Sequence, residues 1–308
     1  MVWRIALWFV AAAAVLLPRT GPFVDRWFSR GLFPWIQRAL TTLSNLAPFA
    51  LFDVLVAVLV LGVIAATLRD LTIRRDGDHR RHDPRRTPVW ARLPIRLATV
   101  AAVAYLVFLA VWGLNYRRQP LTARIPYDAA RVTAENARRL AAQSVSQVNA
   151  LYAPAHGEPW PPADQVDPAL AQAFMAAQPA FGREGPFVPA RPKWSLLDLY
   201  FRRVGVAGMT DPYFLETLVA SDLLVIERPM VVAHEWAHLA GLADEGEANF
   251  AGWLACLRGG ALHRYSAWLF LYGEVVSDLP DDLARRIAEE LDAGPRADLQ
   301  AIRERILT

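Results

Sequence analysis

The chain has 308 residues, enough for a membrane anchor and one further domain of ordinary size. Hydrophobic residues make up 54% of the chain and charged residues only 20%, which excludes a disordered chain, a coiled coil and a solvated arm that binds nucleic acid. The net charge of +3 comes mostly from arginine, and the single cysteine, Cys256, excludes an intramolecular disulfide framework and any metal site built from several cysteines.

Three long apolar runs lie within the first 115 residues, at about 1–17, 48–68 and 96–114. A helix that crosses a bilayer needs roughly 20 apolar residues, and about 17 are tolerated. The second and third runs meet this length, whereas the first is short and could also be a signal peptide. Residues 17–19 offer no small-residue cleavage site, so we expect an uncleaved anchor and three transmembrane helices.

The arginines around these runs predict the orientation of the chain. Residues 69–94 hold eight arginines and four aspartates, and residues 18–47 hold four arginines. The positive-inside rule places 69–94 in the cytoplasm, as a loop, and everything after the third run outside, although Arg117, Arg118 and Arg124 act against this assignment. We expect a multi-pass protein of the inner (plasma) membrane, with the lipid bilayer as a partner and no nucleic-acid ligand.

Two features of the membrane region need separate interpretation. Asp53, just inside the second run, is either a buried ionisable group or the N-cap of the helix near the outer interface, and we favour the N-cap. Residues 27–46 combine aromatic side chains with spaced arginines, which indicates an amphipathic helix lying at the interface.

Residues 1–119 thus form a membrane region, and residues 120–308 have the composition of a globular domain outside the cytoplasm. Apolar periodicity predicts helices in this second domain, whereas β-branched and aromatic residues at 213–226 allow one or two strands. The predicted helical segments are 127–153, 168–178, 194–203 and most of the chain from 229 onward. We therefore expect a mainly α fold with a small β element.

The strongest chemical motif is the sequence His234-Glu235-Trp236-Ala237-His238. Two histidines four residues apart on a helix place both imidazoles on one face, where they can share one Zn²⁺ ion. Glu235 follows the first histidine and can act as general base toward the zinc-bound water. The surrounding helix is apolar, and a metal would compensate the buried polar side chains.

A catalytic zinc site needs a third protein ligand, and three acids follow the motif: Asp244, Glu245 and Glu247. At about 100° per residue, Glu245 and Asn249 share a face of the next helix, whereas Glu247 lies roughly 200° from Glu245. We favour Glu245 as the ligand, with Glu247 and then Asp244 as alternatives, and Asn249 as a residue that orients a ligand.

These motifs resemble the bacterial membrane-protein family called domain of unknown function 3810. The resemblance rests on HEWAHLAG at 234–241 and EGEANF at 245–250, with PFALFD at 48–53, WGLNYR at 112–117 and RYS at 264–266. It implies a three-span anchor followed by an extracytoplasmic zincin-like domain of the gluzincin type, and a zinc metallopeptidase activity with no established substrate.

A broader similarity to zinc peptidases whose third ligand lies in a Glu-x-x-x-Asp pattern supports Glu245. Asn249 stands where that pattern has Asp. The chain also departs from the narrower family at Leu239, where glutamine is expected, so a polar contact beside the second histidine is in doubt.

Three further residues are weaker candidates. Tyr265 or His263 could donate a hydrogen bond to a tetrahedral oxyanion, although we favour an ordinary amphipathic helix as the explanation of Tyr265. Glu216 could belong to an edge strand that pairs with an extended substrate, or could be a solvated strand carboxylate.

The constellation predicts a zinc-dependent hydrolase, a metallopeptidase acting on a peptide or protein. Two alternatives remain open. A structural zinc site could brace a binding domain, although such a site uses four protein ligands and has no need of Glu235. The second alternative is an intramembrane metalloprotease, although charged residues lie too close to both ends of the apolar stretch 225–243 for it to form a transmembrane helix readily.

Overall fold

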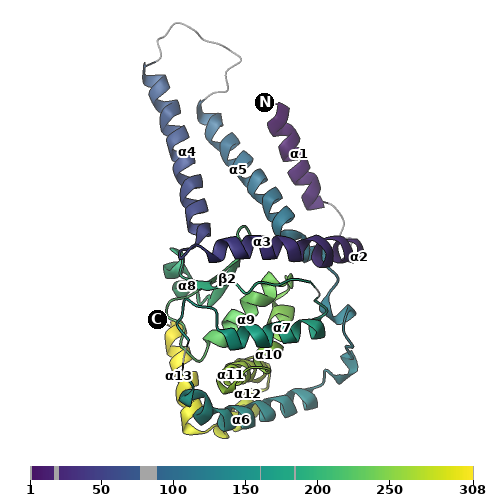
Figure 1. The fold of residues 1–308 in the computed structure, drawn as a ribbon. Helices are drawn as coiled ribbons and strands as arrows, with labels where there is room; N and C mark the ends of the chain where they lie inside the picture. The colour runs from purple at the N-terminus through teal and green to yellow at the C-terminus, as the bar shows by residue number, and fades with distance from the viewer. Residues whose placement is uncertain (1, 17–20, 77–88, 160, 184, 308) are drawn as a thin grey trace.

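The computed structural model describes residues 2–16, 21–76, 89–159, 161–183 and 185–307. Three helices stand side by side at one end, and a mainly helical domain lies at the other, beneath helix α3 (Figure 1). The upright helices are α1 (Val2–Leu16), α4 (Leu51–Asp76) and α5 (Val89–Val111). The crosswise segment consists of α2 (Gly21–Val24), the π-helix η1 (Asp25–Leu32) and α3 (Phe33–Asn45).

Two of the upright helices are long and apolar enough to cross a membrane. The stretches are Leu51–Thr72 in α4 and Ala91–Val111 in α5. Helix α1 is 15 residues long, which is too short to cross a membrane by itself. The number of candidate spans rises from two to three only if α1 and Gly21–Asn45, which meet at a sharp bend, are counted together as one span. The structure therefore supports two of the three predicted spans. The prediction that no cleavage site follows the first run concerns residues 17–19, which lie outside the described residues.

The predicted loop at 69–94 is too long at both ends, because α4 continues to Asp76 and α5 begins at Val89. Asp70 of α4 forms ion pairs with Arg92 (3.1 Å) and Arg96 (2.7 Å) of α5. Asp70 and Arg92, both within the predicted loop, thus join the two helices instead. Residues 77–88 lie outside the described part of the chain.

Residues 27–46, predicted to form an amphipathic helix, are helical up to Asn45, as part of the crosswise segment Gly21–Asn45. In α3 the buried side chains after Pro34 are polar: Gln37, Thr41 and Ser44. Thr41 donates to the carbonyl of Leu215 at 2.9 Å, and Gln37 to that of Val188 at 2.7 Å. Phe28 and Phe33 are buried in the core, but other large apolar side chains in and beside the segment are exposed, namely Trp27, Trp35, Leu43 and Leu46. The outward face is therefore more apolar than is usual for a helix on a water-soluble domain.

The domain below consists of eight α-helices and four short 3₁₀ helices within the described residues. The α-helices are α6 (Ala134–Gly157), α7 (Pro168–Ala177), α8 (Asp198–Val204), α9 (Arg228–Leu239), α10 (Glu245–Cys256), α11 (Ala261–Ser277), α12 (Asp281–Glu289) and α13 (Ala293–Leu307). The 3₁₀ helices are η2 (Gly113–Arg117), η3 (Leu121–Ala123), η4 (Ala129–Arg131) and η5 (Gln178–Phe181). Each helix predicted from the sequence is present. Helix α6 begins later than expected, because Thr133 caps it by accepting from Asn136 N.

A small sheet lies beside α9. It contains β1 (Pro192–Lys193), β2 (Gly208–Asp211) and β3 (Glu216–Val219) in the order β1-β3-β2. Strand β3 is parallel to β1 and antiparallel to β2, with Thr210 opposite Thr217. The predicted strand region 213–226 holds only β3, and β2 precedes it. Asp211 turns the chain between the two strands by accepting from the amides of Tyr213 and Phe214.

The prediction that Glu216 belongs to an edge strand is wrong. Strand β3 lies in the middle of the sheet, and the Glu216 side chain is fully buried in an ion pair with Lys193. Its two oxygens accept from the amides of Leu51 (3.1 Å) and Phe52 (3.0 Å), the first residues of α4. Glu216 therefore caps the helix that carries the first apolar span.

Asp53 does not have the predicted role of N-cap, because Glu216, from β3, accepts from the first two amides of α4 instead. Its carboxylate accepts from Ser195 Oγ at 2.7 Å and from the amide of Leu196 at 2.8 Å. Asp53 and Glu216 together fasten the first turn of α4 to the domain.

Candidate metal centre

Helix α9 carries both histidines of the motif at the centre of the domain. Pro229 stands in its first turn, and the fully buried Trp236 fixes one face of the helix, with Nε1 donating to the carbonyl of Ala190 at 2.9 Å. On another face the rings of His234 and His238 approach each other, and their Nε2 atoms lie 3.1 Å apart. The four-residue spacing therefore produces the shared face that the sequence predicts.

A tight turn returns the chain toward these rings. Gly241 has a φ of +85°, which L side chains rarely adopt, and Asp244 then caps α10 by accepting from Glu247 N at 3.1 Å. Helix α10 packs closely on α9 at Gly252, where an added Cβ would lie 2.9 Å from the backbone nitrogen of His234. This close approach brings the first turn of α10 beside the two imidazoles.

Glu245 is the acid that reaches the histidines. Its Oε2 lies 3.2 Å from His234 Nε2 and 3.5 Å from His238 Nε2. Ligands at about 2.0–2.1 Å from a tetrahedral zinc ion are separated by about 3.3 Å, so the three atoms fit such an ion. Among the described residues this is the one group of histidine, cysteine and acidic side chains close enough to hold a metal.

The two alternative acids are engaged elsewhere. Glu247 accepts from the amide of Leu121 and lies 3.8 Å from Arg124 Nη2. Asp244 serves as the N-cap of α10. The structure thus brings Glu245, and neither Glu247 nor Asp244, to the imidazoles.

Neighbouring polar groups orient both rings. His238 Nδ1 lies 2.7 Å from the carbonyl of Leu242, so Nδ1 carries the proton and Nε2 keeps a free lone pair. Asn249, one turn after Glu245, is a hydrogen-bonding neighbour of the His234 side chain. Asn249 therefore lies where the sequence predicts a residue that orients a ligand.

The charge states of the three groups of the cluster depend on one another. Burial lowers the pKa of His234 to about 4, with a further contribution from His238, so this ring is neutral at physiological pH. Burial also acts to lower the pKa of His238, but the hydrogen bonds to Glu245 and Leu242 and the charges of Glu235 and Glu245 together outweigh it and raise the pKa above its ordinary value. The hydrogen bond with His238 lowers the pKa of Glu245. Its side chain is 76% exposed, so the cluster is open to solvent.

Glu235 lies on α9 between the histidines and the sheet. Its side chain is buried, and Oε2 lies 2.9 Å from the hydroxyl of Thr210 on β2. Gly208, also on β2, makes room for it, because an added Cβ would lie 2.9 Å from Glu235 Oε1. Burial raises the pKa of Glu235 to about 7. A carboxylate with such a pKa can both take and return a proton near neutral pH.

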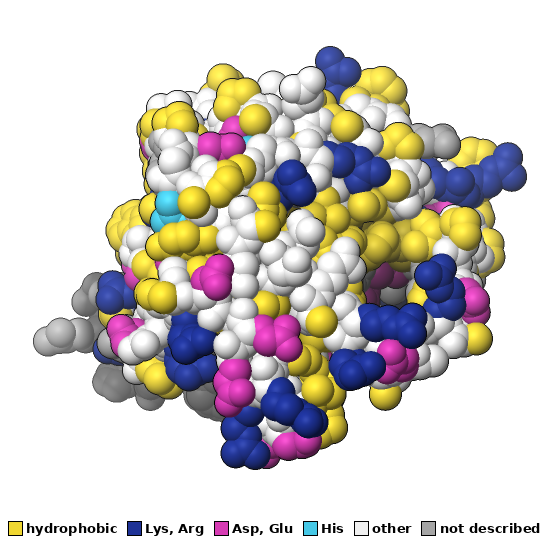
Figure 2. Space-filling view, turned by 90° about the horizontal axis from the view of Figure 1, so that it is seen from below, with side chains coloured by type: hydrophobic (Ala, Val, Ile, Leu, Met, Phe, Trp, Pro, Cys, Tyr) yellow, Lys and Arg dark blue, Asp and Glu magenta, His cyan; other side chains and the backbone are white. Residues whose placement is uncertain are grey.

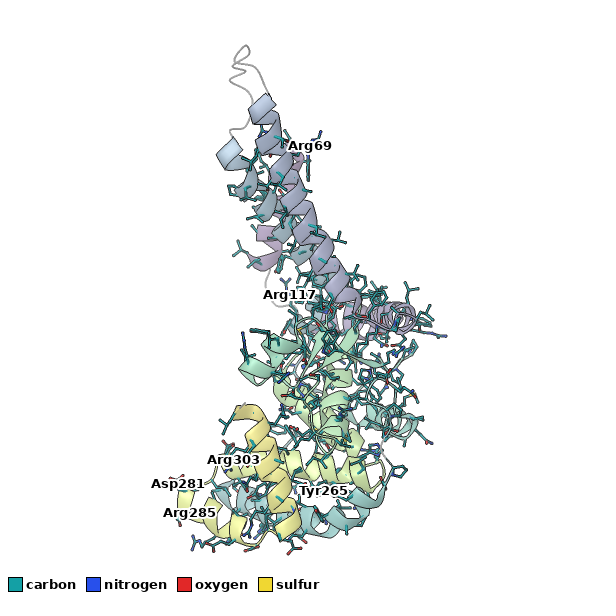
Figure 3. All side chains as sticks on the ribbon, turned by 90° about the vertical axis from the view of Figure 1, so that its left-hand side faces the viewer. Arg69, Arg117, Tyr265, Asp281, Arg285 and Arg303 are labelled. Carbon is teal, nitrogen blue, oxygen red and sulfur yellow. The ribbon has the colours of Figure 1, made fainter. Side chains whose placement is uncertain are left out.

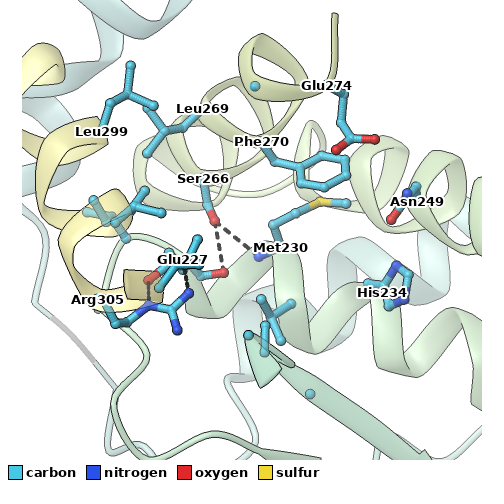
Figure 4. Close-up of a pocket in the computed structure, with 18 of the residues that line it drawn as sticks. Glu227, Met230, His234, Asn249, Ser266, Leu269, Phe270, Glu274, Leu299 and Arg305 are labelled. Atoms are coloured by element: carbon cyan, nitrogen blue, oxygen red, sulfur yellow. Dashed lines mark hydrogen bonds and ion pairs between the residues drawn. The ribbon is translucent and has the colours of Figure 1, made fainter. Parts of the chain in front are cut away.

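A cavity of about 530 Å³ adjoins the cluster and passes between α9, α11 and α13 (Figure 4). His234, Glu235 and Asn249 lie at one end of it. Most of the remaining lining is apolar and includes Met230 and Leu269. The candidate site therefore combines a ligand cluster, a buried carboxyl group and an apolar recess.

The structure does not bring Tyr265 or His263 to this site. The buried Tyr265 hydroxyl donates to Asp298 Oδ2 at 2.6 Å, in the part of the domain remote from the upright helices (Figure 3). His263 Nε2 lies 2.6 Å from Asp167 Oδ2. Both side chains have other partners and neither lines the cavity beside the cluster, so the structure gives no support to an oxyanion role for them.

Two aromatic residues after α5 reach the site and were not predicted to do so. Trp112 Nε1 donates to the carbonyl of His238 at 2.9 Å, and the Trp112 and Tyr116 rings pack edge to face at 5.2 Å. Burial, and then the charge of Glu245, raises the pKa of Tyr116. The only sequence signal was that both belong to the WGLNYR motif, whose function the sequence alone does not specify.

A family model described as "Protein of unknown function (DUF3810)" matches residues 28–307. The match covers both apolar helices, almost all of the crosswise segment after its first turns, and the whole ligand cluster. No curated protein and no solved structure matches the chain.

Proposed function

The chain belongs to the DUF3810 family, and we propose that it is a membrane-anchored, zinc-dependent metallopeptidase. The observation that carries this proposal is the cluster of His234 Nε2, His238 Nε2 and Glu245 Oε2, with separations of 3.1–3.5 Å. Three protein ligands leave one position of a tetrahedral zinc ion open, as in catalytic sites. Zn²⁺ would be the cofactor, and a peptide or protein the substrate.

Two residues beside the cluster, Glu235 and Thr210, would have separate roles in the reaction. A zinc ion held by this cluster would supply a Lewis acid that polarises a carbonyl and activates water. Glu235 accepts a proton at its carboxylate and returns it to the leaving amine, a task that matches its raised pKa. Thr210 holds the Glu235 carboxylate by its hydroxyl and limits the positions it can take.

Strand β2 supports a peptide as the substrate. It lies at the edge of the sheet, and Thr210 and Gly208 place it directly beside Glu235. An extended peptide can pair with such an edge through main-chain hydrogen bonds and so present a carbonyl to the site. This role replaces the one predicted for Glu216, whose strand is central.

The alternatives receive less support. A purely structural zinc site would use four closed protein ligands and would not require a buried carboxyl group beside it. Against an intramembrane protease, the helices able to span a membrane are α4 and α5 among the described residues, whereas the cluster lies on α9 and α10.

We further propose that the domain after α5 lies outside the cytoplasm, at the bilayer surface. Figure 3 shows Arg69 toward the remote end of the upright helices and Arg117 where they meet the domain. Figure 2 shows basic and acidic side chains dispersed over the face opposite these helices, as expected of a surface in water. The arginine-rich 69–94 segment supports a cytoplasmic position for the remote end.

The placement can be tested by thiol labelling in intact cells. Cys256 is buried, so Ser277→Cys at an exposed position provides the one accessible thiol among the described residues. A membrane-impermeant maleimide should label this variant without permeabilisation. Labelling only after permeabilisation would reverse the proposed orientation, and the unmodified protein serves as the control.

The catalytic proposal is tested with Glu235→Gln in the full-length, detergent-solubilised protein. The variant should retain one zinc per chain by metal analysis but lose cleavage of a peptide library followed by mass spectrometry. Glu289→Gln, at an exposed position, is the matched control. Wild-type protein without stoichiometric zinc, or unchanged cleavage by Glu235→Gln, would refute a zinc hydrolase.

A further inference from the structure

The cavity beside the ligand cluster has a chemistry of its own. It begins at His234 and Glu235 and extends about 530 Å³ into the domain between three helices (Figure 4). Its apolar lining comes from all three helices and from the sheet side, with Met230 and Val231 on α9, Leu269 and Phe270 on α11, and Leu299 and Ile302 on α13.

The polar groups at the far end are already paired with one another. Arg305 donates to both carboxylate oxygens of Glu227, at 2.9 and 2.7 Å. The Ser266 hydroxyl accepts from Met230 N at 3.1 Å and lies 3.4 Å from the carbonyl of Glu227. A charged ligand group placed there would have to break these bonds, whereas an apolar group would not.

The position of the cavity decides which part of a substrate could enter it. The cavity starts at the groups that would hold the metal and move the proton, so its contents lie next to the reacting bond. Its volume lies within the range of ordinary ligand pockets, about 300–1,000 Å³, and exceeds what a methyl group could fill.

We propose that this cavity binds a bulky apolar side chain, such as leucine, methionine or phenylalanine, of the substrate residue next to the scissile bond. The proposal rests on the proposed metallopeptidase function and adds its side-chain preference. Loss of fitting methylene groups in such a pocket reduces kcat/KM by roughly tenfold or more, which sets the size of the expected selectivity.

Gly273 offers a direct way to change the cavity. It lies on α11 and lines the cavity, and an added Cβ there would meet no atom within 4 Å. Gly273→Leu should therefore fold normally while occupying part of the space. Leu299→Phe narrows the same cavity from α13. Gly157→Leu is the matched control, because its added Cβ also meets no atom within 4 Å and it does not line the cavity.

The experiment uses the full-length, zinc-loaded protein and peptides that differ only beside the cleaved bond, as phenylalanine, leucine or alanine. Wild type and Gly157→Leu should cleave the phenylalanine and leucine peptides at least about tenfold faster than the alanine peptide. Gly273→Leu and Leu299→Phe should lose most of this difference without losing zinc. An unchanged preference in both cavity variants, or wild-type protein that cleaves the alanine peptide as fast as the other two, would overturn the pocket assignment.

A binding measurement separates failure of the pocket from failure of the enzyme. Hydroxamates that chelate zinc and carry either a benzyl or a methyl group are compared by thermal shift on wild type and Gly273→Leu. A benzyl preference that disappears in Gly273→Leu supports the pocket even if no peptide is cleaved. Equal binding of the two compounds to wild type would contradict the pocket assignment. A lipid that co-purifies with wild type but not with Gly273→Leu, together with an unchanged peptide preference, would also contradict it and would identify the cavity as a lipid site.

Discussion

Trp112 Nε1 donates a hydrogen bond to the backbone carbonyl of His238, at a distance of 2.9 Å. Trp112 directly follows α5, which ends at Val111, so one bond joins the end of an apolar helix to the last turn of α9, the helix that carries His234 and His238. The two rings also pack edge to face, with centroids 6.3 Å apart. Helix α9 is thus positioned partly by the end of α5.

Trp112→Phe removes this bond while keeping an aromatic ring. The His238 carbonyl would lose a buried donor, so we expect the free energy of unfolding to fall by about 1–3 kcal/mol. Zinc affinity should fall as well, because the last turn of α9 is less firmly held. Thermal unfolding with and without zinc measures both effects, with Trp194→Phe at an exposed site as the control. Equal melting temperatures for the two variants would contradict the prediction.

The three acids after the motif should behave differently when each is replaced by alanine. Glu245→Ala removes a ligand and should lower zinc affinity by more than about a hundredfold, beyond the loss usual for groups that only orient ligands. Glu247→Ala should keep zinc but leave the amide of Leu121 without its acceptor, at a cost of about 1–3 kcal/mol. Asp244→Ala should cost about 1 kcal/mol through the lost cap.

Metal analysis and thermal unfolding of the same three variants distinguish these outcomes. Retention of zinc by Glu245→Ala together with its loss from Glu247→Ala would assign the third ligand to Glu247 instead.

Gly208→Ala places a methyl group where the Cβ would lie 2.9 Å from Glu235 Oε1. The carboxyl group must move, so we expect kcat to fall between about tenfold and a hundredfold while zinc stays bound. Gly157→Ala, which adds a Cβ in open space, should leave kcat unchanged. If Gly208→Ala matched the control in kcat, the position of Glu235 would not matter for catalysis.

The buried Lys193–Glu216 pair holds α4 to the sheet. Lys193→Met leaves a buried carboxylate that still accepts from two amides, and should destabilise the protein by about 3–5 kcal/mol. Glu216→Leu strands the ammonium group and both amides, so its effect should be larger. Thermal unfolding ranks the two variants. Glu135→Leu, which removes an exposed ion pair on α6, is the control and should change the melting temperature little. A larger loss of stability in Lys193→Met than in Glu216→Leu would rule out the capping role of Glu216.

The features that could be predicted are those set by local spacing. Four residues along a helix bring His234 and His238 together, and helical phase selects Glu245 over Glu247, since both depend only on α9, α10 and the turn between them. Apolar run length likewise predicts α4 and α5.

The features that could not be predicted depend on tertiary neighbours. Whether β3 is an edge strand depends on β1, a two-residue strand with no pattern of its own, so Glu216 was misplaced. Tyr265 lies on a helix whose phase alone does not reveal that Asp298, 33 residues later, accepts a hydrogen bond from its hydroxyl. The contact of Trp112 with His238 joins residues 126 positions apart.

The crosswise segment Gly21–Asn45 affects how substrates would reach the site. Its polar residues Gln37 and Thr41 are bonded to the domain, while Trp27 and Trp35 are turned outward. With lipid around α4 and α5, those outward rings would rest among the headgroups and prevent the domain from swinging on its anchor. The height and tilt of the proposed metal centre would then be constant, so chains emerging from the bilayer would meet it more readily than freely diffusing proteins.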